Sequence, residues 1–483
     1  MAQNGRLPRD MSLLRLQHEH ITHDLWEGRE RVLRPRRAGV WILNNQDILD
    51  PRVINLMHQA GFGHAVYIPD MDVNHFLISS LLERWRSETH TFHLPHGETT
   101  VTLEDVAVLL GLPIDGDVVT GPTTVQDIFA TFHEHLGVIP PPTVIRGNSI
   151  RVSWLNSTFQ QLPPNANNEV IAQYARAYIL TLIGSILRPD TSAARVHVMY
   201  LLRLADLNVV RNYSWGSAVR ACLYRCLAHG IHLRQENIGG CMILLQCWAW
   251  ERITTIAPQL QPLSDQEVAD GDGFPVCRRW MNVTHRINPA SISVTEFRLR
   301  FDQLRTRQFL WRPYIRQEVS RLIVVDIPSV SRATVPIICF ATVEIHQAYR
   351  VMRQFGLRQN IPPEPVNLDQ VHRDDLRGRN DRDWVGHHHH WITIWNDREN
   401  RIVQGTPFSG NGHLRDETPY MQWYINHTIR YISPSTESSD DEYDMSQQPS
   451  QPASQPYTGH VGSSPDFIHH PQPFFGQSPM GQG

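Results

Sequence analysis

The stretch ETHTFHLPHGE, residues 88–98, places three histidines at intervals of three residues between two glutamates. Imidazole and carboxylate groups are common zinc ligands, so this spacing raises the question of a metal site. β-branched and aromatic residues precede the turn-forming Pro95-His96-Gly97, which predicts a β-hairpin. Along a strand His90 and His93 point to opposite faces and cannot share one ion. We therefore expect histidines that are satisfied within a hairpin, and assign no metal ligands here.

Two further clusters could bear chemistry. The run HHHHW at residues 387–391 offers four imidazoles, but it lies inside a segment of helical pattern (384–395), and we assign it no physiological metal ion. Cys222 and Cys226 stand one helical turn apart with no evident base, so we interpret them as reduced core thiols. We assign no catalytic, cofactor-binding or metal-binding residue. A metal-dependent hydrolase built from scattered carboxylates is kept as the weakest alternative.

The chain contains no lysine, and arginine supplies all 44 basic side chains. A pyridoxal-phosphate aldimine needs a lysine amine, and a Walker A loop and a protein kinase each need a lysine at the nucleotide phosphates. These enzyme classes are excluded, and no cofactor is expected. Arginine instead suits bidentate contacts with carboxylates and phosphates and stacking on aromatic rings.

The formal net charge of −4 comes from an acidic C-terminal segment, and the chain before it is nearly neutral. Six of the 48 acidic residues lie after Pro434, where there is no arginine, so the remainder carries 44 − 42 = +2. This balance does not indicate a strong nonspecific nucleic-acid binder. The basic segment 28–37 could contact DNA or RNA or serve nuclear import, and a solvated arm is an equally good interpretation. Its arginines are Arg29, Arg31, Arg34, Arg36 and Arg37.

The elements that must position these residues are mainly helical. The patterns predict a helical bundle with an N-terminal β-hairpin–helix unit, a few short strands and a disordered C-terminal tail. The length exceeds the roughly 250–300 residues of a single core, so two lobes are expected. No apolar run reaches the roughly 18 residues of a membrane span, and no membrane association is expected. The expected divisions are a basic arm with the first helix at 1–40, a hairpin-bearing part at 41–120, an irregular connection at 121–168, a helical part at 169–432 and the tail at 433–483.

Local signals predict individual elements. Thr102 and Asp105 form a capping-box pattern before a helix over 103–110, and Gly111 is placed to end it. Ser214 and Ser293 are expected to cap later helices. Helices are also predicted within 73–85, 169–187, 192–208, 214–230, 239–253, 293–307 and 342–356, and short buried strands at 322–328 and 335–341.

Past Pro434 the chain is rich in Ser, Gln and Pro, a composition typical of disorder. Ser438 and Ser439 each have an acidic residue three positions later, the pattern of an acidophilic kinase site. Phosphorylation there would add charge to an acidic segment. A spacer without a regulatory role is the simpler interpretation.

Several aromatic-rich blocks, in an order that spans roughly residues 5–430, resemble the plant mobile domain family. The blocks are residues 81–116, WGSAVRACLYRCL, GGCMILLQCWAWERI, Trp311-Arg312-Pro313-Tyr314 and MRQFGLRQNIP. The resemblance is strongest to MAIN-like proteins and to long-form homologues of serine/threonine phosphatase 7. The signature residues, interpreted as structural, are Trp85, His90, Phe92, His93, Gly97, Glu98, Leu103, Asp105, Gly111, Trp215, Gly216, Trp248, Trp250, Glu251, Arg252, Trp311, Pro313, Tyr314, Arg353, Gln354, Phe355 and Gly356.

The resemblance implies a plant nuclear protein, from a domain shared between transposable elements and host genes, that acts in meristem maintenance, genome integrity and transposon silencing. It implies a phosphatase-7-like partner or other mobile-domain proteins. The family's "aminotransferase-like" label conflicts with the absence of lysine, and metallophosphatase motifs are missing. We therefore expect a non-enzymatic interaction module of chromatin. The alternative is a transposon-derived protein that binds DNA or RNA through arginine-rich segments, and the oligomeric state is left open.

Overall fold

A computed structural model describes residues 7–36, 39–189, 194–271, 273–281, 283, 292–374, 382–408 and 412–433. All of them belong to one compact unit, residues 1–436. The expected tail, its two candidate phosphorylation sites Ser438 and Ser439, and Arg37 of the basic arm lie outside the described residues. The division of the chain at residues 121–168 stays a prediction.

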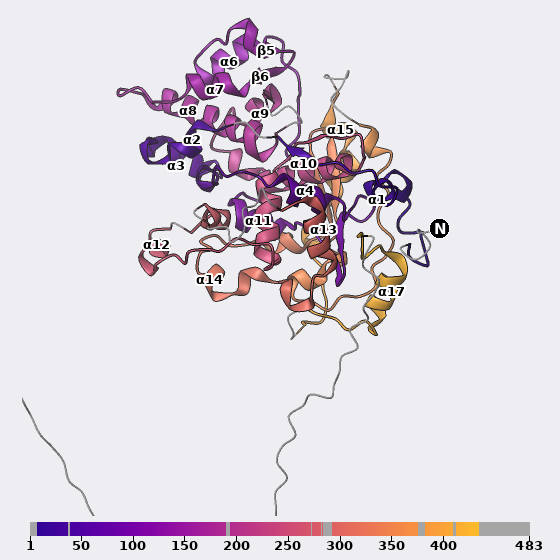
Figure 1. Cartoon of the computed structure of the whole chain (residues 1–483). Coiled ribbons are helices and arrows are strands. Elements are labelled where there is room, and N and C mark those ends of the chain that lie inside the picture. The colour runs from indigo at the N-terminus through magenta and orange to yellow at the C-terminus, as the bar shows by residue number, and fades with distance from the viewer. Residues whose placement is uncertain are drawn as a thin grey trace, which may run out of the picture. The chain divides into compact units, whose positions relative to one another are not determined.

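The fold is mainly helical, as predicted (Figure 1). Short 3-10 turns connect many of the α-helices. Within the described residues the α-helices are α1 (Ile21–Trp26), α2 (Trp41–Asn44), α3 (Pro51–Gln59), α4 (His75–Leu82), α5 (Leu103–Leu110), α6 (Ile128–Leu136), α7 (Val152–Thr158), α8 (Asn168–Leu182), α9 (Val198–Arg203), α10 (Trp215–Gly230), α11 (Met242–Arg252), α12 (Asp265–Ala269), α13 (Val294–Asp302), α14 (Gln317–Ser320), α15 (Trp384–His387), α16 (His389–Asn396) and α17 (Pro419–His427).

The strands are short and form small separate sheets. They are β1 (Arg34–Pro35), β2 (Trp85–Arg86), β3 (Thr91–Leu94), β4 (Gly97–Thr99), β5 (Ile145–Arg146), β6 (Ser149–Arg151), β7 (Arg195–His197), β8 (Asn237–Ile238), β9 (Val335–Cys339) and β10 (Thr342–His346). The sheet orders are β2-β3-β4, β5-β6-β7, β9-β10 and β1-β8, and only the last pair is parallel.

The predicted hairpin–helix unit is confirmed. β3 and β4 pair with Phe92 opposite Thr99 and His93 opposite Glu98, and β2 adds a third strand. The side chain of Thr102 accepts a hydrogen bond from the backbone N–H of Asp105, and the Asp105 carboxylate accepts one from the N–H of Thr102. This reciprocal capping box begins α5, and Gly111 ends it in the left-handed conformation at φ +65°.

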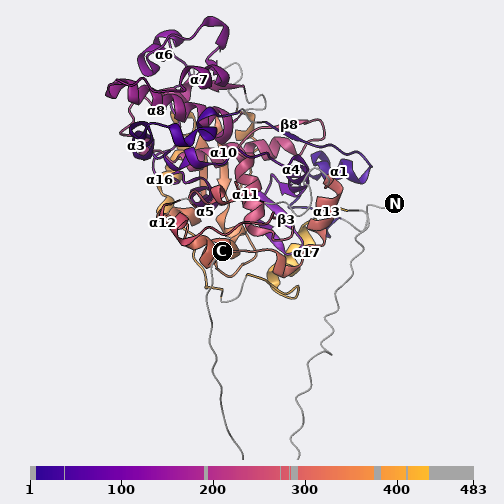
Figure 2. The same ribbon diagram turned by 60° about the vertical axis from the view of Figure 1, so that its left-hand side comes forward.

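Two long helices form the centre of the molecule. Every residue of α11 is buried, including its polar members Gln246, Glu251 and Arg252. α10 and α11 both pack against α5, and α10 also packs against the β9–β10 hairpin. In both views α6 and α7 lie together with α8 at one end of the unit, and α3 packs along α8 (Figures 1 and 2). The hairpin therefore lies against the most buried helices of the chain.

Three expectations about local structure are wrong in part. The connection 121–168 contains α6, β5, β6 and α7, because Asp127 caps two N–H groups of α6 and a left-handed glycine at φ +72° ends it. Residues 322–328 form no strand, since no neighbouring strand pairs with them and only Leu322 is fully buried. The helix predicted at 342–356 is replaced by β10 and two 3-10 turns, because β9 offers β10 a complete antiparallel ladder.

Other helix signals hold with local changes. The hydroxyl of Ser293 caps α13, whereas Ser214 precedes α10 but donates its hydroxyl to Ser217 instead. The helix expected within 192–208 is limited to α9, because the preceding residues pair as β7. The polyhistidine segment is helical, as α15 and α16.

One helical stretch, Asn168–Leu187, is long and apolar enough in composition to cross a membrane. It comprises α8 and the π-helical turn that follows, and 78% of its most apolar window is buried inside the protein. A core helix of a soluble protein has the same properties, so this observation is weak support for a membrane span.

Substitution of Gly97 is a test of how tightly the hairpin turn is packed. Its φ is +127°, and a Cβ there would lie 1.8 Å from Nη2 of Arg353. We expect Gly97→Ala to lower the free energy of unfolding by about 3 kcal/mol, from backbone strain together with displacement of the arginine. In the control, Gly147→Ala, φ is +54° with open space around it, so only strain of about 1 kcal/mol should appear. Equal losses in urea unfolding would contradict this account.

Candidate functional site

The signature blocks, which are far apart in sequence, meet around the β3–β4 hairpin and the first turn of α5. Nearly all of the signature residues in these blocks are buried, and of them only Gly111, Phe355 and Gly356 are partly exposed. Trp85 packs edge-on against Phe92, and Phe92 packs on Trp248 of α11, with ring centroids 5.0 and 5.1 Å apart. The hairpin thus joins the aromatic core of the central helices.

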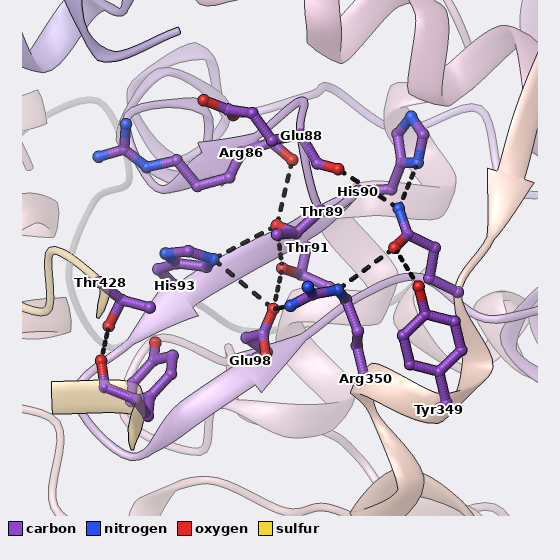
Figure 3. Close-up of polar contacts among 12 residues, drawn as sticks. Arg86, Glu88, Thr89, His90, Thr91, His93, Glu98, Tyr349, Arg350 and Thr428 are labelled. Carbon is purple, nitrogen blue, oxygen red and sulfur yellow. Dashed lines mark hydrogen bonds and ion pairs between the residues drawn. The ribbon is translucent and has the colours of Figure 1, made fainter. Parts of the chain in front are cut away.

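Glu98 is the centre of a polar network on one face of the hairpin (Figure 3). Its fully buried carboxylate accepts hydrogen bonds from Nη1 of Arg350 at 2.8 Å and from the hydroxyl of Thr91 at 3.1 Å. His93 lies 3.8 Å from the same carboxylate and contacts the hydroxyl of Thr89. Each buried charge in this group therefore has an internal partner, as the high cost of burying an unpaired ion requires.

The block around Arg353 holds the opposite side of the hairpin. Its guanidinium lies 3.7 Å from the ring centroid of Trp311 and donates a hydrogen bond to the carbonyl oxygen of His96 at 2.8 Å. Gln354 accepts from the N–H of Thr100 and donates to that residue's carbonyl oxygen, both at 2.9 Å. The hairpin turn is thereby fixed to a segment that lies more than 250 residues later.

Asp105 joins three signature blocks. One carboxylate oxygen completes the capping box of α5, and the other accepts hydrogen bonds from Arg252 at 2.7 Å and from the hydroxyl of Tyr314 at 2.6 Å. Asp105 and Arg252 are fully buried as side chains. Arg252 also donates to the carbonyl oxygen of Trp311. The carboxylate therefore connects a helix start, a central helix and the loop before α14.

The remaining signature residues are held by packing and by hydrogen bonds within the core. Trp215 donates its indole N–H to the carbonyl oxygen of Val210 at 2.9 Å. Glu251 accepts a hydrogen bond from the indole of Trp280 at 2.7 Å. A Cβ at Gly216 would lie 2.7 Å from Ile114, so a larger residue there would separate α10 from the loop after α5. Leu103, Trp250 and Pro313 are buried beside them.

His90 and His93 lie apart, as predicted (Figure 3), but His90 belongs to the turn before β3 and not to the strand, so alternation along one strand is not the reason. His90 has φ +53°, and its Nε2 lies 2.9 Å from Glu344, which is also 3.1 Å from Nε2 of His372. These three groups are close enough together to hold a metal ion. Burial by itself would raise the pKa of Glu344, but Arg225 and the two histidines hold it well below its ordinary value.

The hydrogen bonds around His90 favour a proton rather than a metal ion on its Nε2. Gln347 uses its oxygen to accept from Tyr349 and Arg350, so its amide N–H₂ faces Nδ1 of His90. Nδ1 is then the acceptor, and the proton belongs on Nε2, facing Glu344. A metal ion at Nε2 would require the opposite tautomer and would leave the Nδ1 proton against the amide donor.

A solvent-filled pocket of about 300 Å³ opens above the Asp105 junction. It lies between the start of α5 and three 3-10 turns, at Pro313–Ile315, Ser329–Arg332 and Met352–Phe355. Its walls are both charged and apolar. The lining includes Glu104, Arg312, Tyr314, Ser331, Arg332 and Phe355. Of these four elements, the start of α5 and the turns at Pro313–Ile315 and Met352–Phe355 carry signature residues. The pocket is therefore on the exposed side of the signature core.

The charges of this pocket are not balanced by bonds of their own. Within the described ranges, the side chains of Arg312 and Arg332 form no hydrogen bond or ion pair with protein groups. Burial raises the pKa of Glu104 to about 7, and neighbouring Asp105 adds to the effect, although Arg252, Arg312 and Arg332 oppose it. One carboxyl group and two guanidinium groups without ion-pair partners give the described lining of the pocket a net positive charge.

The basic arm is largely attached to the protein. Arg29 pairs with Asp24, and Arg31 donates to the carbonyl oxygens of Gly230 and His232. Arg36 donates to the side chain of Asn237, and Arg34 is exposed beside it on β1. The structure therefore does not bring these arginines together as one free surface.

The polyhistidine run is also divided. His387 contacts Asp374 at 2.7 Å, whereas His388 is buried and stacked on Trp384, and burial lowers its pKa to about 4. His389 and His390 are exposed. The four histidines span the end of α15 and the start of α16 and differ in exposure and partners, so they do not form one ligand set.

Several residues of the site were missed by the sequence reasoning. Glu344 and Arg350 lie in a segment interpreted as an ordinary helix. Glu104 and Arg312 lie within recognised blocks but were not singled out, and Arg332 lies in no motif. The one available signal was compositional, because a chain rich in arginine but without lysine favours buried, multiply bonded cations.

The importance of the Asp105 junction can be measured. We expect Asp105→Ala to lower the free energy of unfolding by about 3–5 kcal/mol, because Arg252 is left buried without its carboxylate. The control is Asp369→Ala, which removes a half-exposed ion pair with Arg15 and should cost less than about 1 kcal/mol. Chemical denaturation of both variants decides the matter, and a loss below 1 kcal/mol for Asp105→Ala would refute the assignment.

The buried histidines predict that acid destabilises the fold. Burial holds the pKa values of His20, His93 and His346 well below 6.5, while each would titrate near 6.5 when unfolded. Stability is therefore present above pH 6.5 and lost as the pH falls, by about 1 kcal/mol for each histidine at pH 5.5. The raised pKa of Glu104 acts in the opposite sense, since protonation of that group favours the folded state below pH 7.

The measurement is the change in unfolding free energy between pH 7.5 and 5.5. His93→Gln should reduce this pH dependence, whereas the exposed control His389→Gln should leave it unchanged. The same slope in wild type and His93→Gln would show that His93 does not contribute.

Comparison with known proteins agrees with the blocks that form this site. The Plant mobile domain model matches residues 61–425. "Protein MAIN-LIKE 1" of Arabidopsis thaliana is 34% identical over 87% of this chain and 79% of its own length, and "Protein MAINTENANCE OF MERISTEMS" is 30% identical over 87% and 83%. "Serine/threonine-protein phosphatase 7 long form homolog" is 36% identical over 89% of this chain, which spans only 32% of that relative. No solved structure matches. The chain belongs to the plant mobile domain family and is similar to its MAIN-like members.

Proposed function

We propose that this protein is a non-enzymatic interaction module of the plant nucleus that acts in meristem maintenance, genome integrity and silencing. The name of the relative MAINTENANCE OF MERISTEMS supports the role in meristem maintenance. Another relative is named as a long-form homologue of phosphatase 7. A phosphatase-7-like protein or a second mobile-domain protein is the proposed partner.

One observation carries the proposal. The signature carboxylates Glu98 and Asp105, with Glu344 beside them, are fully buried and each is paired with an arginine. A catalytic carboxylate must reach substrate or an activated water molecule, and these groups reach only protein. Their contribution is a rigid framework, which suits a protein whose surface binds other macromolecules.

The second candidate is direct binding of DNA or RNA through the basic arm. Arg34 is exposed, which favours it, whereas Arg29, Arg31 and Arg36 already have protein partners. A nucleic-acid surface of this kind would give strongly salt-dependent affinity. Affinity unchanged in the variant with Arg34, Arg36 and Arg37 replaced by Ala would contradict it.

The test of the main proposal is affinity purification of tagged protein from plant nuclei, with and without nuclease, followed by quantitative mass spectrometry. We expect a phosphatase-7-like or mobile-domain protein to persist after nuclease treatment, and to persist equally with the Arg34/Arg36/Arg37→Ala variant. If every partner disappears with the nucleic acid, the second candidate replaces the first.

A further inference from the structure

The pocket above the Asp105 junction has the chemistry of a ligand site rather than of a packing defect. The pocket has a volume of about 300 Å³ and is lined by two guanidinium groups. Within the described part of the chain, neither group forms a hydrogen bond or ion pair with the protein. Buried arginines of this core, such as Arg252 and Arg350, each donate to carboxylate or carbonyl oxygens, although Nε of Arg252 forms no hydrogen bond. Arg312 and Arg332 are therefore available to a ligand.

The fold makes room for one of these arginines. Gly356 has φ +73°, and a Cβ at that position would lie 2.7 Å from Nη1 of Arg312. The absent side chain allows the guanidinium to lie against the turn at Met352–Phe355, beside Phe355. A signature glycine thus shapes the pocket wall, whereas the neighbouring Arg353 is buried on the other side of the turn, on Trp311.

The polar groups of the pocket are predominantly donors. Arg312, Arg332, Ser329 and Ser331 all offer N–H or O–H groups, and Tyr314 has its hydroxyl committed to Asp105. Glu104 is the only carboxyl group in the lining. A phosphate monoester has three unesterified oxygens and accepts more hydrogen bonds than a carboxylate, and arginine binds it in a bidentate manner.

The rim indicates what carries the phosphate. Ile315 lines the pocket and is 61% exposed, and Val324, close in sequence to the lining residue Ile327, is 58% exposed. The exposed Ile315 at the edge of the pocket can pack against residues that flank a phosphorylated side chain in a peptide, while the arginines hold the phosphate. A backbone phosphodiester, by contrast, leaves only two free oxygens and needs an extended basic track, which this nearly neutral body lacks.

We propose that this pocket binds a phosphorylated side chain of a partner protein, with Arg312 and Arg332 as the phosphate ligands and the Ile315 rim against the flanking peptide. The inference rests on the proposed interaction function and names the chemistry of the partner. It concerns a surface on the outer side of the signature core, and the two proposed phosphate ligands take no part in the hydrogen bonds of the buried network.

The test is calorimetric titration of the full chain with the acetylated peptide Gly-Ile-phosphoserine-Ile-Gly. Comparison ligands are its unphosphorylated twin, inorganic phosphate and a single-stranded RNA oligonucleotide. We expect the phosphopeptide to bind more tightly than any of these, and Arg312→Gln or Arg332→Gln to weaken it by about tenfold or more. The matched control Arg316→Gln alters an exposed arginine of the neighbouring turn that pairs with Glu318, and should leave affinity unchanged.

Binding of inorganic phosphate alone, equal binding of RNA, or equal affinity in the Arg332→Gln and Arg316→Gln variants would overturn the proposal. Unfolding curves show whether the variants are folded. A wild-type protein that captures its nuclear partner but ignores the phosphopeptide would refute this inference alone. A protein that binds the phosphopeptide at these arginines but captures no partner after nuclease treatment would refute the proposed function alone.

Inorganic sulfate provides an independent measurement, because its charge is constant between pH 6 and 8. Burial raises the pKa of Glu104 to about 7; Asp105 on the same helix adds to this effect, and the buried Arg252 and the pocket arginines Arg312 and Arg332 oppose it. Ionised Glu104 repels an anion, so sulfate should bind more tightly at pH 6 than at pH 8. Glu104→Gln should remove this difference, and a difference that persists would separate Glu104 from the anion site.

Discussion

The burial of arginine is the constraint on which the rest of this structure depends. A guanidinium keeps its charge in any environment and presents five donors, so removing it from water requires oxygen acceptors on several sides. Arg84, Arg220, Arg252, Arg350 and Arg353 are among the largest fully buried side chains of the described residues. Asp105 shows how the requirement is met, because its carboxylate begins α5 and at the same time neutralises Arg252. The packing of the central helices and the position of the hairpin follow from such pairs.

This constraint explains why the ionisable residues of the core are gathered in ion pairs and hydrogen-bonded groups. Glu98, Glu344, His90 and His93 have partners within the protein and little contact with solvent. Breaking such a buried pair is costly, and the resulting rigidity suits a binding framework. The pocket beside Glu104 differs, because Arg312 and Arg332 were left without partners while the residues beneath them were satisfied.

Sequence reasoning succeeded where the deciding contacts lie a few residues apart. The capping box of Thr102 and Asp105, the left-handed Gly111 and the β3–β4 turn all close within one element, so their residues alone indicated them. It failed at 342–346, where apolar residues compatible with a helix pair instead with Val335–Cys339. It failed again at 322–328, where a suitable pattern has no strand to pair with. Strand formation depends on a neighbour, and periodicity does not reveal whether one is present.

The sequence by itself determined the family, the mainly helical class, the buried central helix and the exclusion of lysine-dependent chemistry. These follow from composition, hydrophobic period and recognisable blocks. Only the tertiary structure decided which carboxylate each arginine meets, since Arg252 and Arg350 find Asp105 and Glu98 across 147 and 252 residues. It also decided that the histidines are separated and that two arginines face an open pocket. The physical reason is that a buried charge is satisfied by proximity in space, and chain folding sets that proximity independently of sequence distance.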